Sequence, residues 1–262
     1  MPITKKLPSI SNVAAGATFT LSCPVGLTYG KITFEMGGTT FDESLISDLT
    51  VEINGKPVQI FATGTRLVQL NSYYGRPDDT ANGYLTIYFD RPEMNPEFRK
   101  LTGLGTQDVD TLVVKGKIDA SASAPTLEAT ATLYPPQPLG AFVKVKQFPI
   151  SFGAGVNEVD KLPKGPRIIA LHAFAGDFTK VEAELDSFKV FEADKTLAES
   201  LQKESNRTPQ SSAATHVDFC LDGLLSDALV TEGVQDMRFR LTKTAAGAAD
   251  VVVEYLDGFA GI

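Results

Sequence analysis

Short segments of alternating apolar and polar residues constrain the fold of this chain more than any other feature of its sequence. Gly, Pro, Asn and Asp separate these segments, and Asn54-Gly55 between two of them predicts a tight hairpin turn. Many short alternating segments with turn residues between them are typical of an all-β sandwich or barrel. We predict strands at residues 18–22, 30–36, 49–53, 58–62, 83–89, 111–118, 127–133, 142–148, 167–174, 180–185, 217–221, 237–242 and 250–256.

The second half of the sequence repeats the first half in hydrophobic phase, turn position and element order. Residues 49–55 align with 181–187, and residues 84–90 align with 216–222 at the same offset. Between the halves lies the segment Tyr134-Pro135-Pro136-Gln137-Pro138, whose prolines cannot continue a central strand and therefore predict a stiff linker. We predict two β-sandwiches of one topology, at residues 1–134 and 140–262, joined by the Pro-rich linker 135–139.

The number of predicted strands favours a jelly roll in each half, because a jelly roll contains eight antiparallel strands in two sheets. An immunoglobulin-like sandwich is disfavoured, since the chain has no Trp and therefore lacks the Cys…Trp…Cys core pattern. Helical spacing of Leu197 and Leu201 predicts one helix at residues 193–204, and a shorter helical piece is expected near 42–47. The predicted fold class is all-β: two tandem eight-stranded jelly rolls, with one short helix in a long connection of the second barrel.

Composition excludes several classes of function. The chain carries 24 Lys and Arg against 32 Asp and Glu, a net charge of -8, which argues against binding nucleic acid by phosphate neutralisation. Cys23 and Cys220 stand far apart in apolar segments, so we expect buried, inert thiols rather than a disulfide or a zinc site. No apolar region follows Lys5 and Lys6, so no signal peptide is visible and we expect synthesis and retention in a cytosol.

The two histidines are the first candidates for catalysis. His172 lies in an apolar strand segment and is expected to be a structural core residue. His216 and Asp218 share one strand face and, with Ser211, Ser212 or Thr215, could be drawn as a nucleophile–His–Asp set. No G-x-S-x-G segment supports that set, so we interpret the proximity as chance.

Clustered loop carboxylates are candidate calcium ligands. Asp78 and Asp79 lie in a Gly/Pro/Asn-rich loop, and Asp108 and Asp110 flank Val109 at a strand entry. Neither pair matches an EF-hand loop, and solvated loop charges explain both.

Three further carboxylates, Glu182, Glu184 and Asp186, alternate along one strand. A glycosidase could use a facing carboxylate pair, but a solvent-facing sheet produces the same pattern. We therefore predict no catalytic residue and no cofactor-binding residue, and we assign no metal ligands.

Seven short segments give the sequence a family resemblance. They follow in order as SISNVAAG (9–16), RPEM (91–94), LGT (104–106), NEVDKLP (157–163), RIIALH (167–172), VQDMR (234–238) and VVEY (252–255). Together they resemble the major capsid protein of corticovirus-like bacteriophages, which are tailless, icosahedral phages with an internal membrane. No single segment is diagnostic; their shared order along almost the whole chain carries the resemblance.

The resemblance implies a structural role without enzymatic activity. In that family a double jelly roll forms homotrimers with a pseudo-hexagonal outline, which tile an icosahedral virion around a membrane. The expected partners are other copies of the chain and the minor capsid, penton and membrane proteins of the virion, with no direct binding of nucleic acid. Calcium at subunit interfaces is conceivable, no other cofactor is expected, and the chain would be made in the host bacterial cytoplasm.

A carbohydrate-binding or glycan-amidase double jelly roll is the alternative function. Such a protein needs an aromatic platform, and without Trp the only clustered candidates are Tyr73, Tyr74, Tyr84 and Tyr88. A host-derived adhesin domain is a third possibility, but it would be expected to show secretion features.

Overall fold

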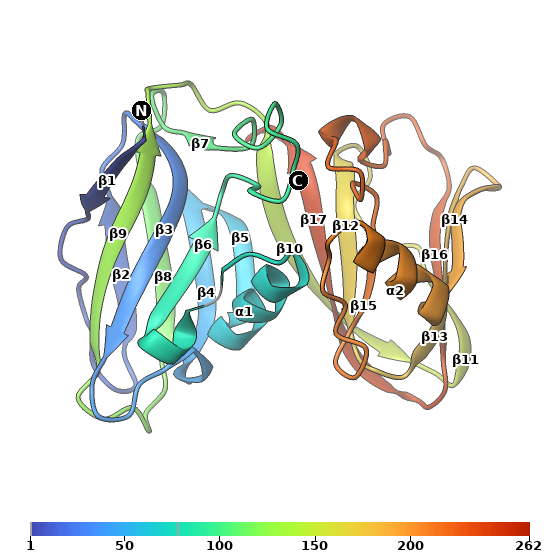
Figure 1. Cartoon of the computed structure of the whole chain (residues 1–262), viewed down its shortest axis with the longest axis horizontal. Coiled ribbons are helices and arrows are strands. Elements are labelled where there is room, and N and C mark those ends of the chain that lie inside the picture. Colours follow the sequence, from blue (N-terminus) through green and yellow to red (C-terminus); the bar gives the residue numbers. More distant parts are fainter. Residues whose placement is uncertain (1, 78) are drawn as a thin grey trace. The chain divides into compact units, whose positions relative to one another are not determined.

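The computed structural model describes residues 2–77 and 79–262 (Figure 1). It contains two compact units, residues 1–145 and 146–262, which are described separately below. The division falls within strand β10 (Phe142–Phe152), after the proline-rich segment 135–139. No helix among the described residues is long and apolar enough to cross a membrane.

The first unit is a sandwich of two sheets. One sheet has the strand order β1-β9-β3-β6, with the short β7 paired to β3. The other sheet has the order β5-β4-β8-β2. The strands are β1 (Ile3–Lys6), β2 (Thr18–Cys23), β3 (Thr28–Gly37), β4 (Ile46–Ile53), β5 (Lys56–Thr63), β6 (Tyr84–Tyr88), β7 (Leu104–Gly105), β8 (Leu112–Ile118) and β9 (Thr126–Tyr134), with helix α1 (Gly64–Tyr73) and the 3-10 turns Glu43–Leu45 and Thr80–Asn82.

The second unit repeats this topology strand by strand. Its elements are β11 (Gly155–Val159), β12 (Arg167–Phe174), β13 (Phe178–Leu185), β14 (Phe188–Asp194), helix α2 (Lys195–Glu204), β15 (Thr215–Asp218), the 3-10 turn Leu225–Asp227, β16 (Met237–Lys243) and β17 (Gly247–Asp257). The strand orders β10-β17-β12-β15 and β11-β16-β13-β14 correspond in sequence to β1-β9-β3-β6 and β2-β8-β4-β5. Both units therefore have the jelly-roll strand order, which confirms the predicted double jelly roll.

The two units also repeat a threonine hydrogen-bond arrangement. Thr106 Oγ1 accepts a hydrogen bond from Gly26 N at 2.8 Å and donates to Leu27 O at 2.6 Å. In the second unit, Thr231 Oγ1 accepts from Gly165 N at 2.8 Å and donates to Pro166 O. Gly26 and Gly165 have φ of 110° and 112°, a backbone conformation that glycine adopts without steric cost. One threonine in each unit thus fixes the same sharp turn.

A second repeated feature is the hairpin that joins β4 to β5 and β13 to β14. Asn54 and Asp186, both with φ near the left-handed region (48° and 46°), occupy the equivalent turn position. Asn54 Oδ1 accepts from the backbone N–H groups of Asp110 and Thr111, and Asp186 Oδ1 accepts from those of Gln235 and Asp236. Short polar side chains tolerate this conformation and bond nearby backbone, so both turns anchor the segment that leads into β8 or β16.

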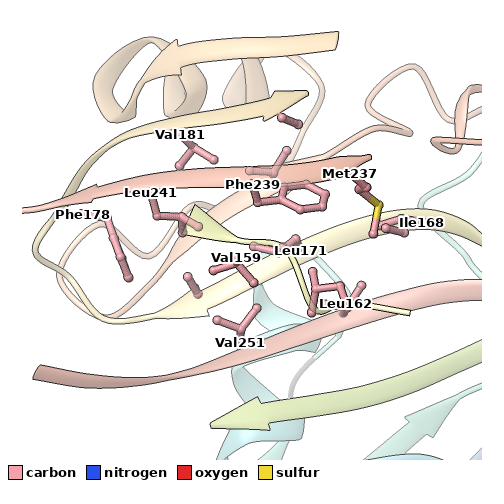
Figure 2. Packing of buried hydrophobic residues seen from close by; sticks show 14 of the residues in the cluster. Val159, Leu162, Ile168, Leu171, Phe178, Val181, Met237, Phe239, Leu241 and Val251 are labelled. Atoms are coloured by element: carbon pink, nitrogen blue, oxygen red, sulfur yellow. The ribbon is translucent and has the colours of Figure 1, made fainter. Parts of the chain in front are cut away.

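Apolar side chains fill the space between the two sheets of each unit. In the first unit, Phe19 on β2 and Phe34 on β3 meet edge to face with ring centroids 6.0 Å apart, which joins the two sheets. In the second unit, Leu171 of β12 points toward Phe239 and Leu241 of β16, and all three are buried (Figure 2). Burial of this kind contributes about 1.5–3 kcal/mol per large apolar side chain.

Helix α1 corrects the prediction of a single helix. Its sequence starts with Gly64 and contains Thr, Val, Asn and Ser, which have low helix propensity, so the segment has no clear helical signal. The helix forms because Leu67, Leu70 and Tyr73 are buried, and because the Thr63 side chain accepts a hydrogen bond from Arg66 N at the N-terminus. The first unit therefore carries a helix in the same connection as α2 in the second.

Most of the predicted strands occur within a few residues of their expected bounds, with informative exceptions. Strands β1, β7, β11 and β14 were not predicted. β7 has only two residues, and the other three lie at sheet edges, where their mostly exposed residues lack strict alternation. The strand expected at 217–221 is instead β15, Thr215–Asp218. It ends early because the Asp218 carboxylate accepts a hydrogen bond from Cys220 N, which turns the chain out of the sheet.

The threonine arrangement predicts a stability loss in each unit. Thr106→Val and Thr231→Val keep the side-chain shape but remove the hydroxyl that accepts from Gly26 or Gly165 N and donates to Leu27 or Pro166 O, so each should lower the free energy of unfolding, within about 1–3 kcal/mol. The loss should be smaller for Thr106→Val, because Gly26 N also donates to the Thr106 backbone oxygen, which valine keeps. Thr179→Val, at an exposed position with only a long 3.4 Å contact to Thr242 O, is the matched control and should change it by less than about 0.5 kcal/mol. Urea unfolding curves measure all three, and a neutral Thr231→Val would contradict this role.

Candidate functional site

The two histidines of the chain form a buried pair in the second unit. His172 on β12 and His216 on β15 lie directly opposite each other in the strand register. Their Nδ1 atoms are 2.8 Å apart and both side chains are almost fully buried. In such a contact only one of the two nitrogens carries the shared proton, so the pair fits two neutral imidazoles of opposite tautomer.

Polar groups surround this pair. Glu254 Oε1 on β17 lies 4.0 Å from His172 Nε2, and Gln202 of α2 donates from Nε2 to the backbone oxygen of His216 at 2.7 Å. Burial, together with electrostatic repulsion from His172 and Lys195, lowers the pKa of His216 well below its usual range. His216 is therefore neutral at neutral pH, and its surroundings disfavour the protonated, charged form of its ring.

The nucleophile–His–Asp set does not form. The Asp218 carboxylate instead makes a buried ion pair with Arg207, with Nε to Oδ2 at 2.9 Å. Ser211 Oγ donates to Glu199 Oε2 at 2.6 Å on the exposed surface. Ser212 is also exposed, whereas Thr215 is buried on β15 opposite Ala173. His172 is therefore a buried residue of the core, as expected, and His216 is buried beside it in the same way.

Two of the four loop carboxylates, Asp79 and Asp108, accept a hydrogen bond from a neighbouring side chain or from the backbone. Asp79 Oδ1 accepts from Asn82 Nδ2 at 2.7 Å, and Asp108 Oδ1 accepts from Leu139 N at 2.7 Å, next to the proline-rich segment. Asp110 is exposed, and Asp78 lies outside the described residues. Among residues 2–77 and 79–262, no three His, Cys, Asp or Glu side chains group closely enough to hold a metal ion.

The acidic face of β13 is covered by cross-strand ion pairs. Glu182 Oε1 contacts Lys189 Nζ at 2.6 Å, and Glu184 Oε2 contacts Arg240 Nη1 on β16 at 2.6 Å. Asp186 binds backbone N–H groups in the hairpin described above. Glu182 and Glu184 thus lie on an outward-facing sheet surface, whereas Asp186 lies in the turn after β13 and not on the strand as expected. The three carboxylates do not face one another as a glycosidase pair would.

The tyrosines do not form an aromatic platform. Tyr73 and Tyr74 are buried, with ring centroids 4.9 Å apart. Tyr84 is partly exposed at the start of β6, and the Tyr88 ring is contacted by Arg76 and Lys31.

The predicted buried thiols are confirmed: Cys23 and Cys220 are both free and buried, and burial raises the pKa of the Cys23 thiol to about 12.

Four apolar side chains of the second unit are exposed on β14 and on α2, the helix that follows it. Phe188 and Val190 of β14 are 72% and 38% exposed, and Leu197 and Leu201 of α2 are 53% and 39% exposed. The helix packs on the barrel through Ala198 and Gln202 instead of through its leucines. We call these four residues the β14–α2 surface. Sequence reasoning missed Phe188 and Val190 because β14 lacks a clear strand pattern.

Comparison with known families covers nearly the whole chain. The family model described as "Viral coat protein P2 N-terminal domain" matches residues 4–134, and the "Viral coat protein P2 C-terminal domain" matches residues 142–259. The chain belongs to the viral coat protein P2 family. It is 28% identical over 259 residues to the major capsid protein P2 of Pseudoalteromonas phage PM2, with 95% of each chain covered.

Solved structures agree with this membership. The crystal structure of the major capsid protein P2 from bacteriophage PM2 superimposes with a TM-score of 0.94, 26% identity and full coverage of both chains. The major capsid protein of Sulfolobus turreted icosahedral virus matches with a TM-score of 0.69 at 13% identity, covering 98% and 96% of the two chains, which shows a shared fold. This P2 family member is a structural capsid subunit, and its place is in the virion capsid.

The histidine pair predicts a loss of stability at mildly acid pH. The unfolded chain binds a proton on His216 near pH 6.5, whereas the folded chain resists it. The free energy of unfolding should therefore fall as pH drops below 6.5, by up to about 1.4 kcal/mol per pH unit for this one group. Urea unfolding between pH 7.5 and 5.5 measures the slope. His216→Gln should remove it, and equal slopes in both proteins would contradict the prediction.

The buried ion pair predicts an asymmetric double-mutant cycle. Arg207→Met leaves the Asp218 charge buried without its main partner and should cost about 3–5 kcal/mol. Adding Asp218→Asn removes that charge, so the double variant should be more stable than Arg207→Met alone. Thermal and urea unfolding measure both changes, and a double variant less stable than the single one would refute the argument.

Proposed function

We propose that this capsid protein acts as a homotrimer that forms a pseudo-hexagonal tile of an icosahedral shell. The observation that carries the proposal is the repeated strand order of the two jelly rolls within one chain. Three copies bring together six barrels of similar shape, so a threefold assembly acquires a nearly sixfold outline. Such an outline packs in a hexagonal lattice, while closed threefold symmetry requires one face of the chain to bind a different face of the next.

The β14–α2 surface supports an assembly role for the second unit. Exposed apolar side chains that cluster on a soluble surface commonly mark protein interfaces. We propose that Phe188, Val190, Leu197 and Leu201 contact a neighbouring copy of the chain within the trimer or the lattice. The ion-paired outer face of β13 next to β14 provides the polar surface that ordinarily surrounds an apolar interface.

The remaining family expectations belong to this proposal. The tile would enclose an internal membrane and meet minor capsid, penton and membrane proteins, without direct contact to nucleic acid. Calcium would act between subunits, where carboxylates of two chains such as Asp79 or Asp110 would combine. The role of the protein is structural rather than catalytic. The buried histidine pair and the ion pair of Asp218 with Arg207 support this.

Light scattering tests the proposed trimer. The purified chain should have a mass of about three times 28.1 kDa, and chelation of calcium should lower the mass only if an ion lies between subunits. A monomer at every protein concentration, with and without millimolar calcium, would reject the trimer.

The β14–α2 surface gives a second, independent prediction. Phe188→Asp places a charge where an apolar contact is proposed and should weaken self-association by at least about tenfold. Leu101→Asp is the matched control, because Leu101 is 62% exposed but lies outside this surface, in the first unit. Light scattering over a dilution series measures both. Equal association of Phe188→Asp and the wild-type protein would show that the surface is not an interface.

A further inference from the structure

A polar pocket of about 370 Å³ lies on the first unit where β9 and β6 end and β3 begins. Its walls come from three adjacent strands, because Lys31 of β3 is directly opposite Thr132 of β9 on one side and Tyr88 of β6 on the other. Residues opposite one another in register point to the same sheet face, so these three side chains share one wall. Arg99 and Lys100 line it from the loop after β6.

The pocket depends on a glycine in β3. A β-carbon on Gly30 would come within 2.6 Å of the Tyr134 ring, so only glycine lets that ring lie across the strand. Gly30 O also accepts hydrogen bonds from Phe89 N and Asp90 N, at the point where the β3–β9 register shifts. This bulge brings the Asp90 carboxylate to Tyr134, whose hydroxyl donates to Asp90 Oδ2 at 2.6 Å. The pocket is therefore shaped by the backbone.

Three cations line the pocket without an ion-pair partner. Among the described residues, no carboxylate oxygen lies within 4.0 Å of the side-chain nitrogens of Lys31, Arg99 or Lys100. Lys31 Nζ and Lys100 Nζ instead lie 5.6 Å and 4.9 Å from the ring centroids of Tyr88 and Tyr134. Such cation–π contacts orient an ammonium group but leave its charge uncompensated.

The local charge differs in sign from that of the whole chain. Three cations and one carboxylate, Asp90, border the pocket, whereas the chain carries a net charge of -8. Asp90 already accepts a hydrogen bond from Tyr134, and its pKa is raised by burial although Arg76, Arg99 and Lys31 act in the opposite direction. An entering anion would find ammonium and guanidinium donors together with the Thr132 hydroxyl.

We propose that this pocket, bordered by Lys31, Arg99, Lys100 and Tyr134, binds a phosphate group. Lys and Arg bind phosphate oxygens through charge-assisted hydrogen bonds, and the spread of the three side chains suits an anion with several oxygens. A second pocket of about 240 Å³ shares Pro2, Lys100 and Tyr134 with the first and extends the space along Thr28 and Gln137. The combined space holds more than an inorganic ion, so the phosphate is expected to be esterified, on a lipid headgroup or on a small soluble molecule.

Calorimetry and vesicle flotation with the full chain in its native assembly state test this inference and separate the two sources. The probes are inorganic phosphate, glycerol 3-phosphate, and phosphatidylcholine vesicles with and without phosphatidylglycerol. The pocket variant is Lys31→Gln with Lys100→Gln. The matched control is Lys5→Gln with Lys117→Gln, which removes the same charge from exposed positions of the first unit. Thermal unfolding verifies that both are folded.

The expected result is saturable binding of phosphate that falls by at least about tenfold in the pocket variant, while the control stays within about twofold. Flotation with phosphatidylglycerol vesicles that only the pocket variant loses identifies a lipid headgroup. Binding of glycerol 3-phosphate with no vesicle dependence on the pocket identifies a soluble ester. The absence of saturable binding to every probe, or an equal loss in the control, would overturn the inference. Neither outcome depends on the proposed trimer.

Discussion

The contact between the two apolar sheet faces of each barrel is the interaction on which the rest of this protein depends. Phe19 against Phe34 in the first unit and Leu171 against Phe239 in the second close a sandwich whose inner residues alternate with outward polar ones. Because strand side chains alternate between faces, a register slip of one residue would expose the whole apolar set. The packed sheets also position the loops, the cross-strand ion pairs of β13 and the polar pocket around Lys31.

Repetition of that frame within one chain is the basis of the proposed trimeric tile. Thr106 and Thr231, and likewise Asn54 and Asp186, make the same backbone hydrogen bonds in the two units. These pairs are polar, local and equivalent in topology, so the two units share details of local structure as well as strand order. A lattice of trimers needs six similar barrels, and a chain with two barrels of one topology provides them through a single type of subunit.

The sequence predicted the fold well where alternation was strong. β12 occurs at its predicted bounds, and the aligned segments 49–55 and 181–187 correspond to equivalent strands and hairpins. Edge strands such as β14 and the helix α1 could not be predicted in this way, because tertiary contacts rather than local propensity stabilise them.

Sites that depend on tertiary contacts could not be predicted from the sequence either. His172 was recognisable as a core residue, but its contact with His216 depends on strand register, and the pocket around Lys31 requires three strands whose pairing the sequence does not state.

The central claim is that three of these two-barrel chains form one tile. Electron microscopy of the purified particles, averaged without imposed symmetry, tests it most directly. We predict compact particles with six lobes of similar size around a threefold axis. Particles with two lobes, or with an even-numbered arrangement of chains such as a dimer, would contradict the account.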